Sequence, residues 1–412
     1  MFRGQRETLD KEHQAILAAN HGAVWIHAAS VGEFEQARPL IEMIRGAANA
    51  NGHEAKRQHV VVTFFSPSGY EARKNYDQAD AVLYLPFATR RKARKFLEAL
   101  QPRMAFFVKY EFWPAYLREL KKRGIPTYSI SAIFRPQQRF FHWYGKSSLR
   151  LLHHFTHIFV QDEASRRLLA EHGVHEVSVA GDTRFDRVHE IVKKLNSNEQ
   201  RSRLTNSLQP IAEFVAGCER VIVGGSTWPQ DEVLLKQFIC NQASVPGYQP
   251  KLILVPHEID ETHLHFIFNL FQGRFVHYSA LRDMPAGSSR QNILQRAQVM
   301  IIDTIGLLSS IYHFGHVAYI GGGFGVGIHN TIEAAVYGIP VLFGPNYQHF
   351  REAKGLIEAG AARSISTYQE LETTMTMALN QHETIGAKAA AYVESELGAT
   401  EKIYKQIFGN NN

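Results

Sequence analysis

The chain has 412 residues, of which 45% are apolar and 20% are charged. This length exceeds one ordinary hydrophobic core and predicts two domains of comparable size, and the composition does not fit a disordered chain. The formal charge of +6 suits an acidic partner such as a phosphorylated lipid, a nucleic acid or an anionic small molecule, and it is equally compatible with plain solubility.

The chain has two cysteines, Cys218 and Cys240, which lack metal or redox spacing and fit free thiols in a reducing compartment. The first residues are polar and contain no signal-peptide core. No apolar run approaches the roughly 18 to 20 residues that would cross a bilayer. We therefore expect a cytoplasmic topology.

Short apolar runs alternate with helical patterns through the first half, which is typical of a parallel sheet covered by helices on both faces. Helices are predicted at residues 32–45 and after Ser66, where Pro67 suits a first helical position. The expected strands lie at residues 23–28, 59–65, 81–85, 104–108, 126–130 and 158–160.

The second half repeats this alternation after a polar segment, residues 193–209, in which we place the hinge. Its expected strands lie at residues 220–226, 251–255, 299–303, 317–320 and 340–343. The predicted fold is α/β, with two Rossmann-like doubly wound domains, 1–200 and 201–412, facing across a cleft. Such an arrangement allows the terminal helix to pack back on the first domain. Ligands are expected beyond the carboxyl ends of the strands.

Two carboxylates follow strands of the first predicted sheet. Glu33 comes after the tight turn at Gly32, where it is placed to act as a general base or, more simply, to favour the helix dipole. Glu111 follows another strand and lies among Lys109 and aromatic residues, which suits a sugar face or a charged loop beside core aromatics. Both side chains are expected at one edge of the sheet.

Basic and aromatic residues are interleaved at residues 133–146, which include Arg135. This pattern fits a membrane surface, single-stranded nucleic acid or a helix that covers part of the core. The basic run at residues 90–95 is interpreted as a solvated helix face.

The most informative segment is residues 320–333, where four glycines follow an apolar strand and lead into an expected helix at residues 331–337. Such a turn leaves backbone N–H groups at a helix N-terminus, which favours phosphate. Glu333, in the first turn, is placed to accept hydrogen bonds from ribose hydroxyls. The segment indicates the donor half of a nucleotide-sugar enzyme.

Further polar residues follow other strands of the second half. Ser226 and Thr227 can cap a helix and donate to phosphate, and His257 offers a base or a phosphate contact. Residues 303–306 end a third strand. The histidine spacing does not support a metal site, because no zinc-protease pattern is present.

Five motifs resemble, in their order along the chain, those of 3-deoxy-D-manno-octulosonic acid (Kdo) transferases. They are Ser-Val-Gly-Glu at 30–33, Glu-Phe-Trp-Pro at 111–114, Gly-Ser-Thr at 225–227, Asp-Thr-Ile-Gly at 303–306 and His-Asn-x-x-Glu at 329–333. The likeness runs from about residue 25 to residue 362. It implies a GT-B glycosyltransferase that moves Kdo from CMP-Kdo to the lipid A precursor, lipid IVA, in lipopolysaccharide core biosynthesis.

The resemblance also implies roles for individual residues. Glu33 becomes the general base of an inverting, metal-independent transfer that needs no cofactor, and Glu111 assists it. The acceptor is expected to contact Ser30, Gly32, Lys109 and Arg135. The donor is expected to contact Ser226, Thr227, His257, Asp303, Thr304, Gly322, Gly323, His329, Asn330 and Glu333, with the glycine turn neutralising the CMP phosphate.

Members of the family act at the cytoplasmic face of the inner membrane and usually begin with an apolar anchor helix. We expect membrane contact here through basic and aromatic surface, or through an anchor outside this chain. Another GT-B enzyme that uses a UDP-sugar, either a transferase or a 2-epimerase, is the alternative. A nucleic-acid-binding protein ranks lowest, because it leaves the strand-end carboxylates unexplained, so no nucleic-acid partner is expected.

Overall fold

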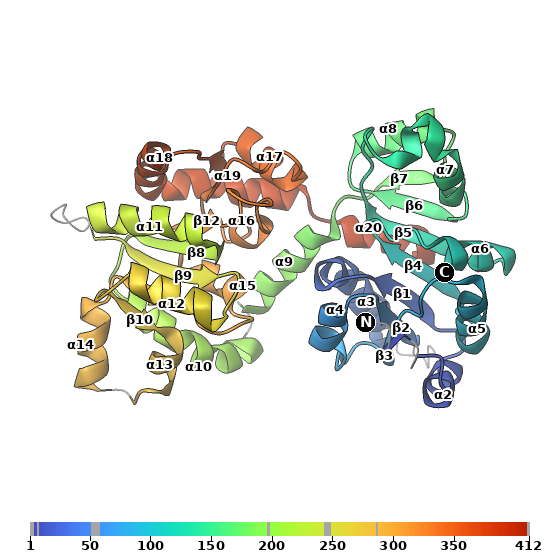
Figure 1. Cartoon of the computed structure of the whole chain (residues 1–412), viewed down its shortest axis with the longest axis horizontal. Coiled ribbons are helices and arrows are strands. Elements are labelled where there is room, and N and C mark those ends of the chain that lie inside the picture. The colour runs from blue at the N-terminus through green and yellow to red at the C-terminus, as the bar shows by residue number, and fades with distance from the viewer. Residues whose placement is uncertain are drawn as a thin grey trace. The chain divides into compact units, whose positions relative to one another are not determined.

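The computed structural model describes residues 4–5, 8–50, 58–195, 198–242, 249–285 and 287–409. The chain forms two compact units (Figure 1). The first contains Met1–Arg187 together with Glu396–Asn412, and the second contains Val188–Ser395. The boundary thus precedes the predicted hinge at residues 193–209. That segment is helical up to residue 195 and again from residue 198, and residues 196–197 lie outside the described part.

The first unit is built on a sheet of seven parallel strands, in the order β3-β2-β1-β4-β5-β6-β7. The strands are β1 (Val24–Ala28), β2 (Val60–Phe64), β3 (Ala81–Tyr84), β4 (Met104–Val108), β5 (Thr127–Ala132), β6 (His157–Val160) and β7 (Val177–Val179). The strand order reverses between β1 and β4. In a doubly wound sheet, this reversal opens a crevice at the carboxyl ends of the two strands.

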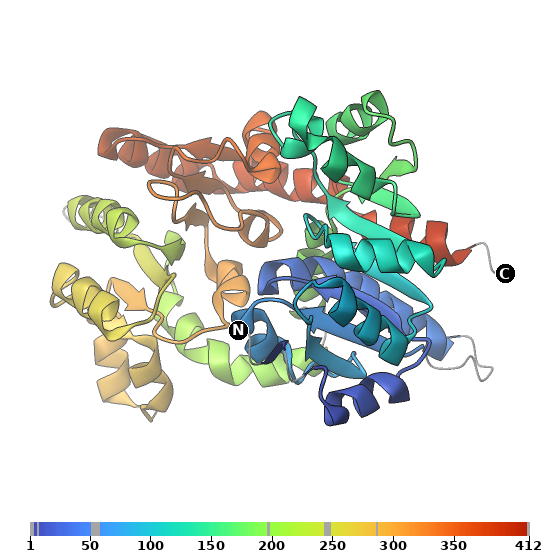
Figure 2. The same cartoon turned by 45° about the vertical axis from the view of Figure 1, so that its right-hand side comes forward.

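Helices cover both faces of this sheet (Figures 1 and 2). One face packs against α3 (Val31–Ala50), α4 (Pro67–Arg73) and the C-terminal α20 (Ala399–Phe408). The other packs against α2 (Lys11–Ala19), α5 (Arg90–Leu100), α6 (Pro114–Lys122), α7 (Lys146–Leu152) and α8 (Glu163–Glu171). Two short 3-10 helices, η1 (Arg139–Phe141) and η2 (Trp143–Gly145), precede α7, and α9 (Thr183–Leu195) leads out of the unit. Each face therefore has its own apolar core.

The helix α20 returns to the first unit at the end of the chain. Its Ile403 side chain is fully buried in the core beneath α3. Asp186 fixes its start, because the carboxylate accepts hydrogen bonds from the N–H of Gly398 (2.7 Å) and from the N–H (2.7 Å) and hydroxyl (2.6 Å) of Thr400. The first unit is thus formed from two separate stretches of the chain.

The second unit has its own sheet of seven parallel strands, in the order β10-β11-β9-β8-β12-β13-β14. The strands are β8 (Val221–Thr227), β9 (Lys251–Pro256), β10 (Phe275–His277), β11 (Val299–Ile301), β12 (Val317–Ile320), β13 (Val341–Phe343) and β14 (Ala362–Ser364). Here the order reverses between β8 and β12, so the crevice is expected where the glycine-rich segment follows β12.

One face of the second sheet packs against α11 (Pro229–Gln242), α12 (Glu261–Leu270) and α18 (Tyr368–Asn380). The remaining helices of the unit are α10 (Asn198–Val215), α13 (Tyr278–Asp283), α14 (Ser288–Arg296), α15 (Leu308–Ile311), η3 (Tyr312–Phe314), α16 (Ile332–Ala335), α17 (Arg351–Glu358) and α19 (His382–Ser395). The two doubly wound α/β units confirm the predicted fold class.

Candidate active site

The reversal between β1 and β4 brings the two predicted carboxylates together. Glu33 lies in the first turn of α3, directly after β1, and Glu111 lies in the turn after β4. β1 and β4 are hydrogen-bonded neighbours, with His27 opposite Phe107 near their carboxyl ends. The charge of Glu111 raises the pKa of Glu33, which places the two carboxylates within electrostatic reach of each other.

The Glu33 side chain is half-buried, and its carboxyl group has a raised pKa. Its Oε2 accepts a hydrogen bond from the N–H of Ala29 (2.6 Å), and its own N–H donates to Ser30 Oγ (3.4 Å). Burial and the negative charge of Glu111 raise the pKa of Glu33 from 4.5 to about 7, against the lowering effects of the Ala29 N–H and Lys109. A carboxyl group with this pKa can take up a proton near neutral pH.

Glu111 is held by two donors, of which sequence reasoning identified neither. Its Oε2 accepts from the indole N–H of Trp113 and lies 3.2 Å from Nε2 of His27. His27 is a fully buried residue of β1. Its two partners come from the strands on either side, because Thr63 lies on β2 and Glu111 follows β4. The role of this histidine therefore becomes visible only when the three strands are paired.

The other predicted acceptor residues lie around this edge of the first sheet. Lys109 adopts a left-handed backbone (φ 58°) after β4, and its ammonium group lies 5.7 Å from the ring centre of Tyr110. Arg135 follows β5, and burial raises the pKa of Tyr110 against the lowering effect of the Arg135 charge. Gly32 has open space where a side chain would begin. The structure therefore gathers these residues on one edge, and their contacts with an acceptor stay a prediction.

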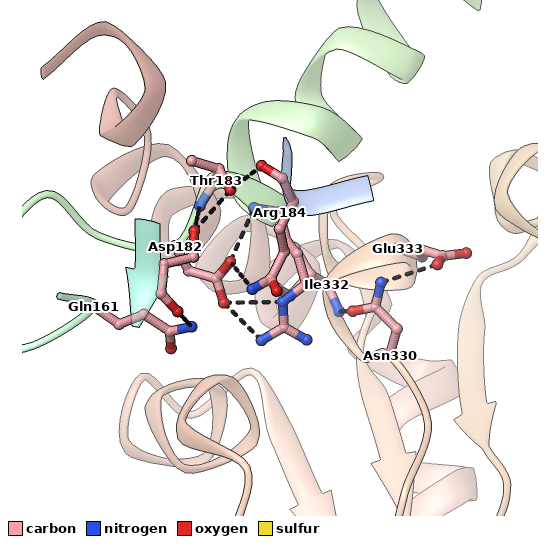
Figure 3. A network of polar contacts seen from close by, with 9 residues as sticks. Gln161, Asp182, Thr183, Arg184, Asn330, Ile332 and Glu333 are labelled. Carbon is pink, nitrogen blue, oxygen red and sulfur yellow. Dashed lines mark hydrogen bonds and ion pairs between the residues drawn. The ribbon is translucent and has the colours of Figure 1, made fainter. Parts of the chain in front are cut away.

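A buried polar network that the sequence did not reveal lies at the same sheet edge (Figure 3). Asp182, which follows β7, is fully buried, and its Oδ2 accepts from Nε (2.9 Å) and Nη2 (2.7 Å) of Arg184. Its Oδ1 accepts from Nε2 of Gln36, one turn after Glu33 on α3. Arg184 and its bonds lower the pKa of Asp182 against the raising effect of burial, so the side chain is a carboxylate that fixes the guanidinium.

In the second unit, close backbone packing accounts for much of the glycine-rich segment. A side chain at Gly323 would meet the backbone of Gly344, 2.6 Å away, and Gly322 has a φ of +89°. The amides of Gly325 and Gly327 donate to the carbonyl of Gly322. The predicted helix at residues 331–337 is only the four-residue α16. The helix is therefore shorter than predicted, and the two amides that donate to Gly322 already have partners, so a phosphate contact at this turn stays a prediction.

Asp231, a residue that sequence analysis missed, anchors this glycine turn. Its buried carboxylate accepts from the N–H of Gly322 (2.9 Å), the N–H of Trp228 (3.0 Å) and the hydroxyl of Tyr319 (2.8 Å). Burial raises the pKa of Asp231, although each of these bonds lowers it. It joins the start of α11 to the end of β12, on either side of the reversal between β8 and β12.

Three aromatic rings stack beside this turn. Trp228 and His257 have ring centres 5.0 Å apart, and His257 and His329 have centres 4.1 Å apart. The indole N–H of Trp228 donates to Nε2 of His329 (3.1 Å). Burial and the proximity of His257 lower the pKa of His329 to about 4, so this imidazole is neutral at pH 7. The structure thus brings the two predicted histidines together.

A cavity of about 330 Å³ opens between the start of α11 and the glycine turn. It is lined by Trp228, Pro229, Gln230, Asp231, Gly322, Phe324, Gly325 and Val326. Its size is at the lower end for small-molecule pockets, and aromatic and aliphatic groups with one buried carboxylate line it. It is a candidate binding site within the second unit.

Other predicted donor residues have internal partners. Thr227 is fully buried, and its hydroxyl donates to Glu232 (2.9 Å), so a phosphate contact by this side chain stays a prediction that would require this bond to change. Asp303 accepts from the N–H (3.0 Å) and hydroxyl of Ser279, and it therefore fixes the start of α13. Ser226 adopts a left-handed backbone (φ 53°) at the end of β8.

Asn330 and Glu333 form a pair at the start of α16 (Figure 3). Nδ2 of Asn330 donates to Oε1 of Glu333 (2.9 Å), and Ser309 Oγ donates to Oε2 (2.5 Å). Thr304 has a buried hydroxyl oxygen without a hydrogen-bond partner among the residues that the structure describes. A ribose contact by Glu333 stays a prediction, in which the ribose would replace or join these donors.

Within the described ranges, no three His, Cys, Asp or Glu side chains are grouped so that they could hold a metal ion. A search of the same ranges for a helix with the length and apolarity needed to cross a bilayer finds none.

Solved structures with similar folds cover nearly the whole chain. The UDP-GlcNAc 2-epimerase from Neisseria meningitidis, bound to UDP-GlcNAc, matches 94% of this chain and all of its own chain, with a TM-score of 0.65 and 17% identity. The UDP-GlcNAc 2-epimerase from Methanocaldococcus jannaschii matches 90% of this chain and 98% of its own, with a TM-score of 0.58 and 15% identity. With two doubly wound units, these likenesses define a GT-B fold.

Sequence comparison finds likeness to Kdo transferases. Residues 4–187 match the family described as 3-deoxy-D-manno-octulosonic-acid transferase (kdotransferase). Relatives named 3-deoxy-D-manno-octulosonic acid transferase are 26% identical in Rickettsia prowazekii (94% of this chain, 78% of that protein) and 26% in Aquifex aeolicus (87% and 86%). A third, from Haemophilus influenzae, is 27% identical (87% and 80%). Residues 4–187 thus match the Kdo transferase family, nearly the whole chain is similar to enzymes of that name, and the chain is a glycosyltransferase.

Proposed function

We propose that this chain transfers Kdo from CMP-Kdo to the lipid A precursor, lipid IVA, in lipopolysaccharide core biosynthesis. Glu33 carries the proposal, because a half-buried carboxylate with a pKa of about 7 lies at the strand reversal of the first unit, beside Glu111. The family relatives, which are named for Kdo transfer, support the substrate class.

In the proposed reaction, the Glu33 carboxylate takes the proton of the glucosamine 6-hydroxyl of the acceptor. The freed oxygen forms a bond to the anomeric carbon of Kdo, and the bond from that carbon to the phosphate oxygen of CMP breaks, with its electron pair leaving on CMP. A single displacement of this kind inverts the anomeric centre. The transfer needs no cofactor or metal, so a chelator such as EDTA should leave the rate unchanged.

The donor is proposed to bind the second unit at the reversal between β8 and β12. The ring stack of Trp228, His257 and His329 offers a flat surface, and the Asn330–Glu333 pair offers polar groups for ribose hydroxyls. Because His329 is neutral at pH 7 and its Nε2 accepts the Trp228 indole N–H, its Nδ1 carries the hydrogen and can donate one hydrogen bond without adding charge.

We place the enzyme at the cytoplasmic face of the inner membrane, in peripheral contact with the lipid surface. Two exposed aromatic side chains in the first unit support this, since Trp143 is 86% exposed and Tyr144 is 61% exposed. Lys146 follows them, and α5 presents the exposed basic residues Arg90, Arg91, Arg94 and Lys95. Aromatic and basic side chains together suit an anionic interface.

The decisive experiment incubates the protein with CMP-Kdo and tetraacylated lipid IVA and analyses the lipid by mass spectrometry. The expected product carries added Kdo, and the Glu33→Gln variant should form none above background. An unmodified lipid with wild-type protein, under conditions where a known Kdo transferase works, would overturn the proposal.

A UDP-sugar enzyme, either a transferase or a 2-epimerase, is the second candidate, and the likeness in fold to UDP-GlcNAc 2-epimerases favours it. Nucleotide stabilisation separates the two, because a ligand that binds only the folded state raises the melting temperature. CMP should raise it and UDP should not. The reverse result, with epimerised UDP-GlcNAc as product, would support the second candidate.

A further inference from the structure

The indole of Trp228 is hydrogen-bonded to the imidazole of His329 in the second unit. Its Nε1–H donates to Nε2 of His329 over 3.1 Å. The His257 ring stacks on both partners, because its centre lies 4.1 Å from that of His329 and 5.0 Å from that of Trp228, with interplanar angles of 26° and 29°. The stack therefore covers a hydrogen-bonded pair of rings.

The backbone on both sides of this pair is tied to one carboxylate. Oδ2 of Asp231 accepts the N–H of Trp228 (3.0 Å) and the N–H of Gly322 (2.9 Å). A side chain at Gly322 would come within 3.1 Å of the His329 ring. The turn that follows closes where the N–H of His329 donates to the carbonyl of Gly321 (3.2 Å). The indole and the imidazole are thus held opposite each other by the chain itself.

The indole determines which imidazole nitrogen carries the hydrogen. An indole N–H can only donate, so Nε2 of His329 accepts and carries none. Burial and the proximity of His257 lower the pKa of His329 to about 4, so the ring has a single hydrogen at neutral pH, on Nδ1. Within the described ranges Nδ1 has no hydrogen-bond partner and, unlike the Thr304 hydroxyl, it is not fully buried. This N–H is therefore accessible to a ligand.

We propose that Trp228 is a positioning residue for the nucleotide, which holds His329 in the tautomer whose Nδ1–H donates to the nucleotide phosphate. The proposal rests on the proposed function, in which the Asn330–Glu333 pair meets the ribose, and the phosphate is the acceptor on the 5′ carbon of that ribose. In the other tautomer, the imidazole would present a lone pair to the anion. Trp228 disfavours that form, because two N–H groups would then face each other.

The first test compares the affinities of CMP and cytidine, measured by calorimetry at pH 8. An imidazole with an ordinary pKa of about 6.5 is neutral at this pH. Trp228→Phe keeps an aromatic ring beside His257 but imposes neither tautomer. The apparent Kd for CMP should rise by the inverse of the fraction in the Nδ1–H form, on the order of threefold to tenfold. Cytidine has no phosphate and should show only the effect of altered stacking, so the ratio of the two affinities should change.

Matched variants separate the hydrogen bond from ring packing. Trp25→Phe also removes a buried indole hydrogen bond, to Thr63 in the first unit, and should leave both affinities unchanged. His329→Asn places an amide N–H near the position of Nδ1 and needs no partner to fix its protons, so it should bind CMP more tightly than His329→Ala. In the His329→Asn background, Trp228→Phe should no longer alter the CMP-to-cytidine ratio. Circular dichroism checks that each variant is folded.

The second test detects the tautomer without any ligand, by NMR of protein with 15N-labelled histidine and with His329→Asn for assignment. The wild-type spectrum should show a protonated Nδ1 and an unprotonated Nε2 at His329, and Trp228→Phe should shift the pattern toward a protonated Nε2. A protonated Nε2 in the wild-type protein, or an unchanged CMP-to-cytidine ratio in folded Trp228→Phe, would overturn the proposal.

Failure of the proposed function gives a different result. If the wild-type protein binds UDP and not CMP, the assignment of CMP-Kdo as donor fails, and the affinities of UDP and uridine replace those of CMP and cytidine in the same comparison. The tautomer of His329 is measured without nucleotide, so it decides this inference whichever sugar donor the enzyme uses.

Discussion

Replacing Glu33 with glutamine should make the protein inactive and, at alkaline pH, more stable. The isosteric amide keeps an oxygen that can accept the Ala29 N–H but removes the titrating proton. The pKa of Glu33 rises from 4.5 to about 7 on folding, chiefly through burial. Since one pKa unit is about 1.36 kcal/mol, ionised Glu33 lowers the free energy of unfolding by about 3 kcal/mol.

The sign of the pH dependence follows from this shift. The folded chain binds the proton more tightly than the unfolded chain, so the stability from protonated Glu33 is present below about pH 4.5. It is lost as the pH rises through about 7. Glu33→Gln should therefore melt on the order of 5 °C higher than wild type at pH 8.5, in a unit of about 200 residues, and show little difference at pH 4.5.

The assay pairs differential scanning calorimetry at the two pH values with the rate of Kdo transfer. The wild-type rate should fall as the pH drops through about 7, where Glu33 becomes protonated. Loss of a general base lowers the rate by about 10²- to 10⁴-fold. Glu98→Gln, at an exposed carboxylate on α5, is the matched control and should resemble wild type. An equal melting difference at both pH values, or wild-type turnover, would refute the reasoning.

Substitutions at three further residues test the remaining geometry. Glu111→Gln removes a negative charge beside Glu33, so the acid limb of the pH–rate profile should move to lower pH; an upward shift would contradict the pairing. Asp231→Ala leaves three donors without their acceptor and should reduce stability by about 2 kcal/mol and weaken CMP binding, measured by calorimetry. Asp231→Asn keeps one acceptor oxygen for the Gly322 and Trp228 amides and should be milder, so equal losses would argue against a hydrogen-bonding role. Glu333→Ala should weaken CMP binding before it affects folding, and an unchanged affinity would count against the ribose contact.

The fold was largely predictable from the sequence, because strands buried on both faces are nearly continuous apolar runs. Predicted strands at residues 104–108 and 317–320 match β4 and β12 to the residue. The missed strands β7, β10 and β14 have three residues each, and all three lie at the edges of their sheets. Short edge strands carry too few apolar residues to form a recognisable run, and pairing with one neighbour decides their conformation.

The position of a candidate residue was predictable where it comes within a few residues of the end of a strong strand, as at Glu33 and Glu111. It was not predictable where the role of a residue depends on a distant partner. His27 looks like an ordinary strand residue until Thr63 and Glu111 are placed beside it, 36 and 84 positions away. Similarly, Asp231 follows a proline at a helix start, and its bond to Gly322 spans 91 positions.

The interrupted first unit has a consequence for biosynthesis. Residues 188–395 of the second unit are contiguous, whereas the first unit needs residues 396–412, which are made after the whole of the second unit. Until α20 emerges, the apolar surface that receives Ile403 stays open to solvent and to other nascent chains. The unit that is begun first is therefore finished last, and a chain shortened by its final helix would leave the ribosome with that surface uncovered.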